Sequence, residues 1–94
     1  MITEEERKEA IKRLQDNKNK SSRYDLFGYD NHAAIDIAIR VIKEDMSQDL
    51  INKTWDGETD ESENLWLSAI GARNFLNGEC QLSDILYPEK PIMI

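Results

Sequence analysis

The stretch that decides the fold is Asp30-Asn-His-Ala-Ala-Ile-Asp-Ile-Ala-Ile-Arg-Val-Ile-Lys-Glu-Asp-Met46. Its apolar residues recur at the spacing of one helix face, and they are Ile35, Ala38, Ile39, Ile42 and Met46. Asp30 stands where the N-cap of this helix is expected. A strand over residues 35–41 is the competing interpretation because Ile and Val favour sheets, but the intervening alanines and the length of the pattern favour a helix. The stretch therefore predicts a central helix that starts after Asp30.

A first helix is predicted on the N-terminal side of the central one. Thr3 and Glu6 have the spacing of a capping box, in which each side chain accepts a hydrogen bond from the backbone of the other residue. The polar run over residues 16–20 ends this helix, and Ser21-Ser22 marks a loop. The aromatic segment over residues 23–29 then suits a structured loop folded onto the core.

Two more helices are predicted on the C-terminal side. We expect Ser47 to cap a short helix that carries Leu50, Ile51 and Trp55 and ends at Asp56-Gly57. We expect Ser62 to cap a longer helix that Asn77-Gly78 closes, because a glycine commonly follows the last helical turn. One further turn over residues 83–87 precedes an apolar tail, residues 91–94. The fold class predicted is all-α, a small compact bundle of three main helices plus one or two short helices.

Length and composition indicate one small domain. The chain has 94 residues, of which 39% are apolar and 33% are charged, so the core is thin and the surface heavily solvated. We predict a single helical domain over residues 1–94. Because Cys80 is the only cysteine, no internal disulfide can form, and association into a homo-oligomer is one expected route to further stability.

No segment of the sequence has the character of a signal peptide or a membrane span. The N-terminus is highly charged from Thr3 onward, and the apolar run over residues 33–42 is short and interrupted by Asp36 and Arg40. We therefore expect a cytoplasmic protein that does not contact a membrane.

The net charge of −7 is concentrated in one part of the chain. Residues 1–29 carry seven basic and six acidic groups, whereas the stretch from Glu44 to Glu63 holds eight acids against Lys53 alone. A field of this sign repels phosphate backbones, so direct binding of nucleic acid is not expected. The acidic stretch is better matched to a protein partner that carries positive charge.

The residues needed for metal binding or catalysis are missing from the sequence. With one His and one Cys, the chain cannot supply the ligands of a zinc or iron site, and the acidic loop lacks the spacing of an EF-hand. No nucleophile elbow accompanies the single imidazole, and the glycines do not form a phosphate-binding loop. We expect no enzymatic activity, no metal and no cofactor. For His32 and Asp36, four residues apart, a hydrogen bond within the central helix is the favoured interpretation.

Two candidate binding sites remain. The first is the acidic loop, whose partner-binding candidates are Asp56, Glu58, Asp60, Glu61 and Glu63. The second lies where aromatic and polar groups converge on the start of the central helix, and its ligand-binding candidates are Arg23, Tyr24, Phe27, Asp30, Asn31 and His32. For the second segment a structural interpretation competes, in which Leu26 and Phe27 pack the loop against the core and Asp30 only caps the helix.

The segment Phe27-Gly28-Tyr29-Asp30-Asn31-His32-Ala33-Ala34-Ile35-Asp36 resembles a group of small proteins encoded by bacteriophages and prophages, in which Phe-Gly-x-Asp-Asn-His-x-Ala-Ile-Asp opens a helix. An acidic stretch with a tryptophan follows in that group, as at Trp55. An alanine-rich helix with Ala-Arg near its end then closes on a glycine, as at Ala72-Arg73 and Gly78. The likeness covers roughly residues 23–80. It implies a phage accessory protein in the cytoplasm of a bacterial host and transfers no binding residues.

Two functional hypotheses follow. The favoured one is an accessory protein that binds a host or phage macromolecule, with a protein as the expected partner, through its acidic surface. The alternative is a small-ligand or nucleotide-binding module built on the segment from Arg23 to His32.

Overall fold

The protein was studied as a computed structural model that describes residues 2–24, 26 and 28–81. The chain forms α1 (Glu4–Lys20), α2 (Asn31–Glu44), α3 (Gln48–Asn52) and α4 (Asp60–Leu76). Within the described ranges no strand forms, and an isolated bridge between Tyr24 and Asp30 closes the loop between α1 and α2. The predicted all-α bundle of three main helices and one short helix is confirmed. The turn expected over residues 83–87 and the apolar tail lie outside the described residues.

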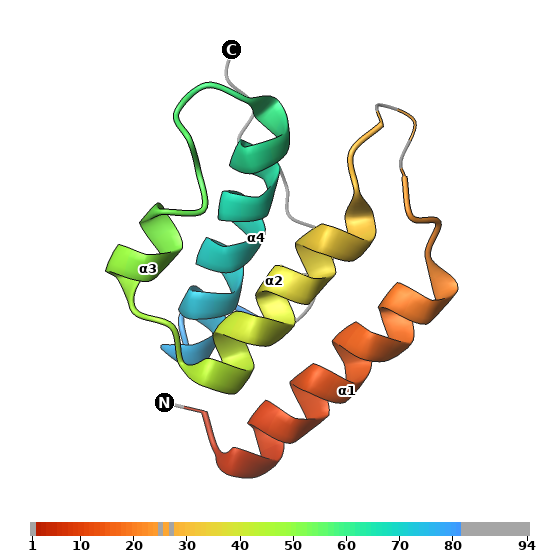
Figure 1. The fold of residues 1–94 in the computed structure, drawn as a ribbon. Coiled ribbons are helices and arrows are strands. Elements are labelled where there is room, and N and C mark those ends of the chain that lie inside the picture. Colours follow the sequence, from red (N-terminus) through yellow and green to blue (C-terminus); the bar gives the residue numbers. More distant parts are fainter. Residues whose placement is uncertain (1, 25, 27, 82–94) are drawn as a thin grey trace.

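Helix α2 is the central element of the bundle (Figure 1). It packs against α1 on one side and against α4 on the other, while α3 packs against α4. Figure 1 shows α1 and α2 as an antiparallel pair, whereas α2 and α4 run in the same general direction because α3 and the following loop lead the chain back to the top of the view. This topology brings the acidic loop to the end of the bundle where α4 begins.

The core lies between the inner faces of α1, α2 and α4. Its buried apolar side chains are Ala10, Leu14, Ala38, Val41, Ile42, Met46, Ile51, Ala69, Ala72, Phe75 and Leu76. Four of these residues are alanines, and small side chains at a helix contact allow the helix axes to approach closely. The many apolar positions of α2 are explained by its neighbours, because a helix covered on two sides needs a wide apolar surface.

The capping predictions for the first three helices are confirmed. The hydroxyl of Thr3 accepts from the backbone N–H of Glu6 at 3.1 Å, and the Thr3 N–H donates to the Glu6 carboxylate at 3.3 Å. The Asp30 carboxylate accepts from the N–H of Ala33 at 3.0 Å, and the Ser47 hydroxyl accepts from the N–H of Leu50. Each side chain satisfies a backbone donor that lacks a partner within the helix.

The C-terminal end of α4 also follows the prediction. Asn77 is the C-cap, and Gly78 has a φ of 78°, in the left-handed region that glycine adopts without strain. The N–H of Gly78 donates to the carbonyl of Phe75, and that of Glu79 to the carbonyl of Asn74.

Several element boundaries differ from the sequence predictions. Helix α4 is capped by Thr59, not Ser62, because the Thr59 hydroxyl accepts from the Ser62 N–H at 3.3 Å. Helix α3 ends at Asn52, so Trp55 lies beyond it. Met46 is buried but follows the end of α2, where Asp45 turns the chain with a φ of 51°.

The aromatic loop also departs from its structural interpretation. Leu26 is fully exposed and cannot attach the loop to the core, so that part of the interpretation is wrong. Phe27 lies outside the described residues. The loop is instead held by backbone contacts, since the N–H of Asn31 donates to the carbonyl of Arg23 at 2.6 Å.

Candidate functional site

The acidic loop between α3 and α4 is organised around the carboxylate of Asp56. This carboxylate accepts from the backbone N–H groups of Glu58 at 2.8 Å and Thr59 at 2.9 Å. It also accepts from the hydroxyls of Ser62 at 2.9 Å and Thr59 at 3.0 Å. The Asp56 N–H donates back to the Ser62 hydroxyl at 3.2 Å. Asp56, Thr59 and Ser62 therefore tie the loop to the first turn of α4.

These hydrogen bonds lower the pKa of Asp56 far below its usual value of 3.8. The N–H groups of Thr59 and Glu58 contribute most, followed by the Ser62 hydroxyl, because each donor stabilises the ionised carboxylate. Asp56 was predicted as a partner-binding residue, but its two carboxylate oxygens are already occupied within the loop. Its role in the structure is to shape the loop.

The other four partner-binding candidates lie together around the start of α4. Glu58 is in the loop, and Asp60, Glu61 and Glu63 are in the first turn of the helix, where carboxylates interact favourably with the helix dipole. We call these four residues the acidic surface. Within the described part of the chain, none of the ion pairs includes them, whereas acids elsewhere pair with Arg13, Lys18, Arg23, Arg40 and Arg73.

A pair of tryptophans, Trp55 and Trp66, flanks the acidic surface along the chain. The ring centroids of Trp55 and Trp66 are 5.1 Å apart with an interplanar angle of 31°. The indole N–H of Trp66 donates to the side-chain oxygen of Asn52 at 3.3 Å, and Gln48 donates to the same oxygen at 2.9 Å. The sequence analysis placed Trp55 on the short helix and did not predict its contact with Trp66.

The second predicted site is a small cavity at the start of α2. The cavity has a volume of about 290 Å³ and is lined by Lys18, Arg23, Asp30, His32, Ala33 and Asp36. Three predicted ligand-binding residues, Arg23, Asp30 and His32, therefore meet there. Tyr24 is exposed and lies under the Arg23 guanidinium at 5.4 Å, and the Asn31 side chain donates to the carbonyl of Ser22 at 3.4 Å.

The charges of this cavity are paired with one another. Lys18 lies 2.9 Å from Asp36, and Arg23 lies 3.2 Å from Asp30. The N–H of Ala33 and then the Arg23 guanidinium hold the pKa of Asp30 below its usual range. The hydrogen bond to Asp30 in turn raises the pKa of Arg23. Each cation in the cavity thus already forms an ion pair with a carboxylate of the same cavity. The small-ligand site stays a prediction.

The expected hydrogen bond between His32 and Asp36 is wrong. The Nε2 atom of His32 lies 3.0 Å from the backbone carbonyl of Ser21, and a carbonyl can only accept, so this nitrogen carries a proton. Asp36 instead forms an ion pair with Lys18 of α1. The His32 contact ties the end of α1 at Ser21 to α2, and the Lys18–Asp36 pair joins the two helices directly, which gives His32 a structural role.

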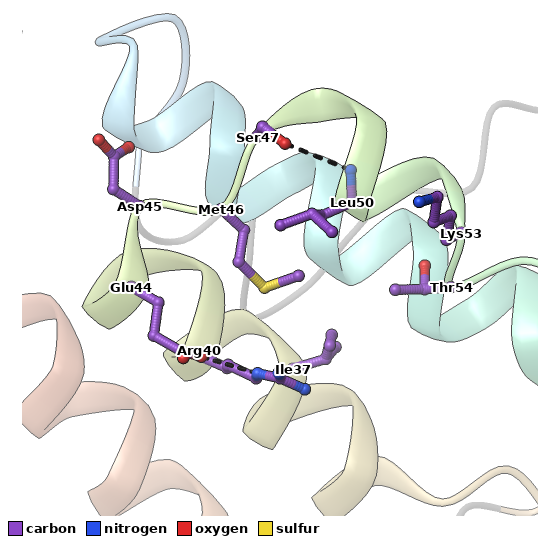
Figure 2. A pocket seen from close by; sticks show the side chains of 9 residues that line it. All are labelled: Ile37, Arg40, Glu44, Asp45, Met46, Ser47, Leu50, Lys53 and Thr54. Atoms are coloured by element: carbon purple, nitrogen blue, oxygen red, sulfur yellow. Dashed lines mark hydrogen bonds and ion pairs between the residues drawn. The ribbon is translucent and has the colours of Figure 1, made fainter.

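Figure 2 shows a larger groove between α2 and α3 that sequence reasoning did not predict. It has a volume of about 550 Å³, and its apolar lining includes Ile37, Met46 and Leu50. Its rim carries the Arg40–Glu44 ion pair, with a distance of 2.7 Å. Two basic residues, Arg40 and Lys53, and two acidic residues, Glu44 and Asp45, line the groove, so its charges balance.

The described residues contain no group of three or more His, Cys, Asp and Glu side chains placed to hold a metal ion. None of the helices in this part of the chain combines the length and the apolar character that a membrane span requires. Comparison of the chain with protein-family models, with curated proteins and with solved structures found no match.

The pKa of Asp56 leads to a prediction about stability. A carboxylate whose pKa is lowered on folding stabilises the protein above its unfolded pKa, and this contribution is lost as the pH falls toward the folded pKa. Asp56→Asn should therefore melt at a lower temperature than the wild type at pH 7, and the difference should narrow below about pH 4. Thermal unfolding followed by circular dichroism between pH 7 and pH 2.5 measures this.

Asp60→Asn is the matched control, since it removes one carboxylate from the adjoining first turn of α4 without removing a described hydrogen bond of the Asp56 cluster. A difference between Asp56→Asn and the wild type that stays constant over the whole pH range would contradict the assigned role of Asp56.

Proposed function

We propose that this chain is a phage-borne accessory protein that binds a basic protein of the host or the phage through the acidic surface. The observation that carries the proposal is the position of Glu58, Asp60, Glu61 and Glu63, which gather around one helix end without a described basic partner. Like charges this close repel one another, and a basic partner relieves that repulsion.

The organisation of the loop supports binding over a purely solubilising role. The carboxylate of Asp56 accepts hydrogen bonds from within the loop and from the first turn of α4, so the backbone that carries Glu58 and Asp60 is held in one conformation. A preformed surface loses less conformational entropy when a partner binds. The phage context rests on the resemblance of residues 27–36, and the acidic field favours a basic protein over a nucleic acid.

The dependence of binding on salt tests this proposal. The partner is captured from a bacterial lysate with the immobilised protein, purified, and its affinity is then measured over a series of salt concentrations. We expect the affinity to fall steadily as the ionic strength rises, because the Debye length is only about 10 Å at 0.1 M salt. An affinity that does not change with salt would exclude the acidic surface as the binding site.

A further inference from the structure

The exposure of Trp55 is the starting observation. Its side chain is 38% exposed, although tryptophan is the largest apolar residue and the chain has only two of them. The ring of Trp66 lies against the indole at a centroid distance of 5.1 Å, and more than a third of Trp55 still faces solvent. Burying the rest of an exposed indole is favourable, and tryptophan is enriched among the residues that dominate binding energies.

The two rings are held in place before any partner arrives. Trp66 is fixed by its hydrogen bond to Asn52 at 3.3 Å. The backbone beside Trp55 is fixed because the next residue, Asp56, exchanges hydrogen bonds with Ser62, which lies one turn before Trp66. An aromatic side chain ordered in this way costs little conformational entropy on binding.

The charges near the Trp55–Trp66 pair indicate which kind of chemical group would bind there. Trp55 is followed directly by the loop that carries the acidic surface, and Glu63 lies three residues before Trp66, on a neighbouring position of α4. Lys53 is the only basic residue between positions 44 and 63. A cation is therefore favoured both by the carboxylates and by the negative face of the indole.

We propose that the Trp55–Trp66 pair is the docking point for an arginine side chain of the basic partner. This inference rests on the proposed function and names the group that the partner supplies. A guanidinium is planar and weakly hydrated, so it stacks on an indole while its N–H groups donate to nearby carboxylates, whereas a lysine ammonium holds its water more strongly. The chain already makes a contact of this type, with Arg23 lying 5.4 Å from the ring centre of Tyr24.

The test uses two blocked peptides of equal length and charge, one alternating glycine with arginine and the other alternating glycine with lysine. Affinities are measured by fluorescence anisotropy of labelled peptides at low salt, and the tryptophan emission of the wild type is recorded in parallel. The arginine peptide should bind about three- to tenfold more tightly than the lysine peptide and should change the emission. Trp55→Leu should remove this preference, Trp55→Phe should keep part of it, and Leu50→Ala, which shortens an exposed apolar side chain of α3, should leave it intact.

The outcomes separate this inference from the proposed function. Equal binding of the two peptides, an unchanged wild-type emission, or a full arginine preference in Trp55→Leu would each overturn the docking point. The proposed function survives those results if replacement of the acidic surface by lysine still lowers the affinity of the protein for both peptides. If that replacement changes the affinity for neither peptide, the proposed function fails as well. The tryptophan emission of the wild type still tests the docking point if Trp55→Leu does not fold.

Discussion

Ile51→Ala should lower the free energy of unfolding by about 2–5 kcal/mol. The Ile51 side chain is fully buried and is the one buried residue of α3. A helix of five residues has no stability of its own, so its position depends on this side chain and on the packing of α3 against α4. Since about 1 kcal/mol corresponds to roughly 4–8 °C for a domain of this size, thermal unfolding should show a large decrease in Tm.

Leu50→Ala is the matched control for this prediction. Leu50 is the preceding residue of the same helix and is half exposed, so its replacement should change the free energy of unfolding by about 0.5 kcal/mol or less. Equal effects of the two substitutions would mean that α3 does not attach to the core through Ile51.

Replacement of Glu58, Asp60, Glu61 and Glu63 by lysine should abolish binding of the captured partner and leave the protein folded. The four carboxylates supply the local negative potential, and their reversal turns an attraction into a repulsion of the basic partner. Asp56 is kept because its carboxylate shapes the loop. Lysines in the first turn of α4 oppose the helix dipole, at a cost of about 0.3–1 kcal/mol each, so Tm must be measured before binding is interpreted.

Two further proteins complete this experiment. A variant that retains Glu63 measures how much of any loss of stability comes from reversing that one charge in the first turn of α4. A second variant reverses Glu4, Glu5, Glu9 and Asp16 of α1, which gives the same change of net charge on a different surface. We expect this second variant to bind far better than the first. Equal loss of binding in both would indicate that only the net charge matters.

The fold could be predicted where neighbouring residues decide the structure. Thr3 with Glu6, Asp30 with Ala33 and the glycine after Asn77 act over three or four positions, so their roles are visible in the sequence. The start of α4 was placed wrongly because Thr59 and Ser62 are both good capping residues. Asp56 decides which of the two residues caps α4, because it accepts hydrogen bonds from both hydroxyls and so fixes their positions.

The candidate site could be predicted only in part. The charge of the acidic loop was plain from composition, but the sequence could not show that Asp56 is occupied within the loop and that the neighbouring carboxylates are not. The Trp55–Trp66 contact and the pairing of Lys18 with Asp36 join residues 11 and 18 positions apart. Contacts of this length depend on how the helices pack, and no local pattern encodes them.

The central position of α2 has a consequence for how the molecule moves in an electric field. On one side lies α1, which carries six basic and five acidic side chains, and on the other lie α3 and the loop that leads into α4 (Figure 1). Because the acids gather on one side, the centres of positive and negative charge do not coincide, and the molecule has an electric dipole. Near a positively charged body such a dipole experiences a torque. The protein would therefore turn its α3–α4 side toward that body before the two surfaces touch, and a larger fraction of collisions would begin in a productive orientation.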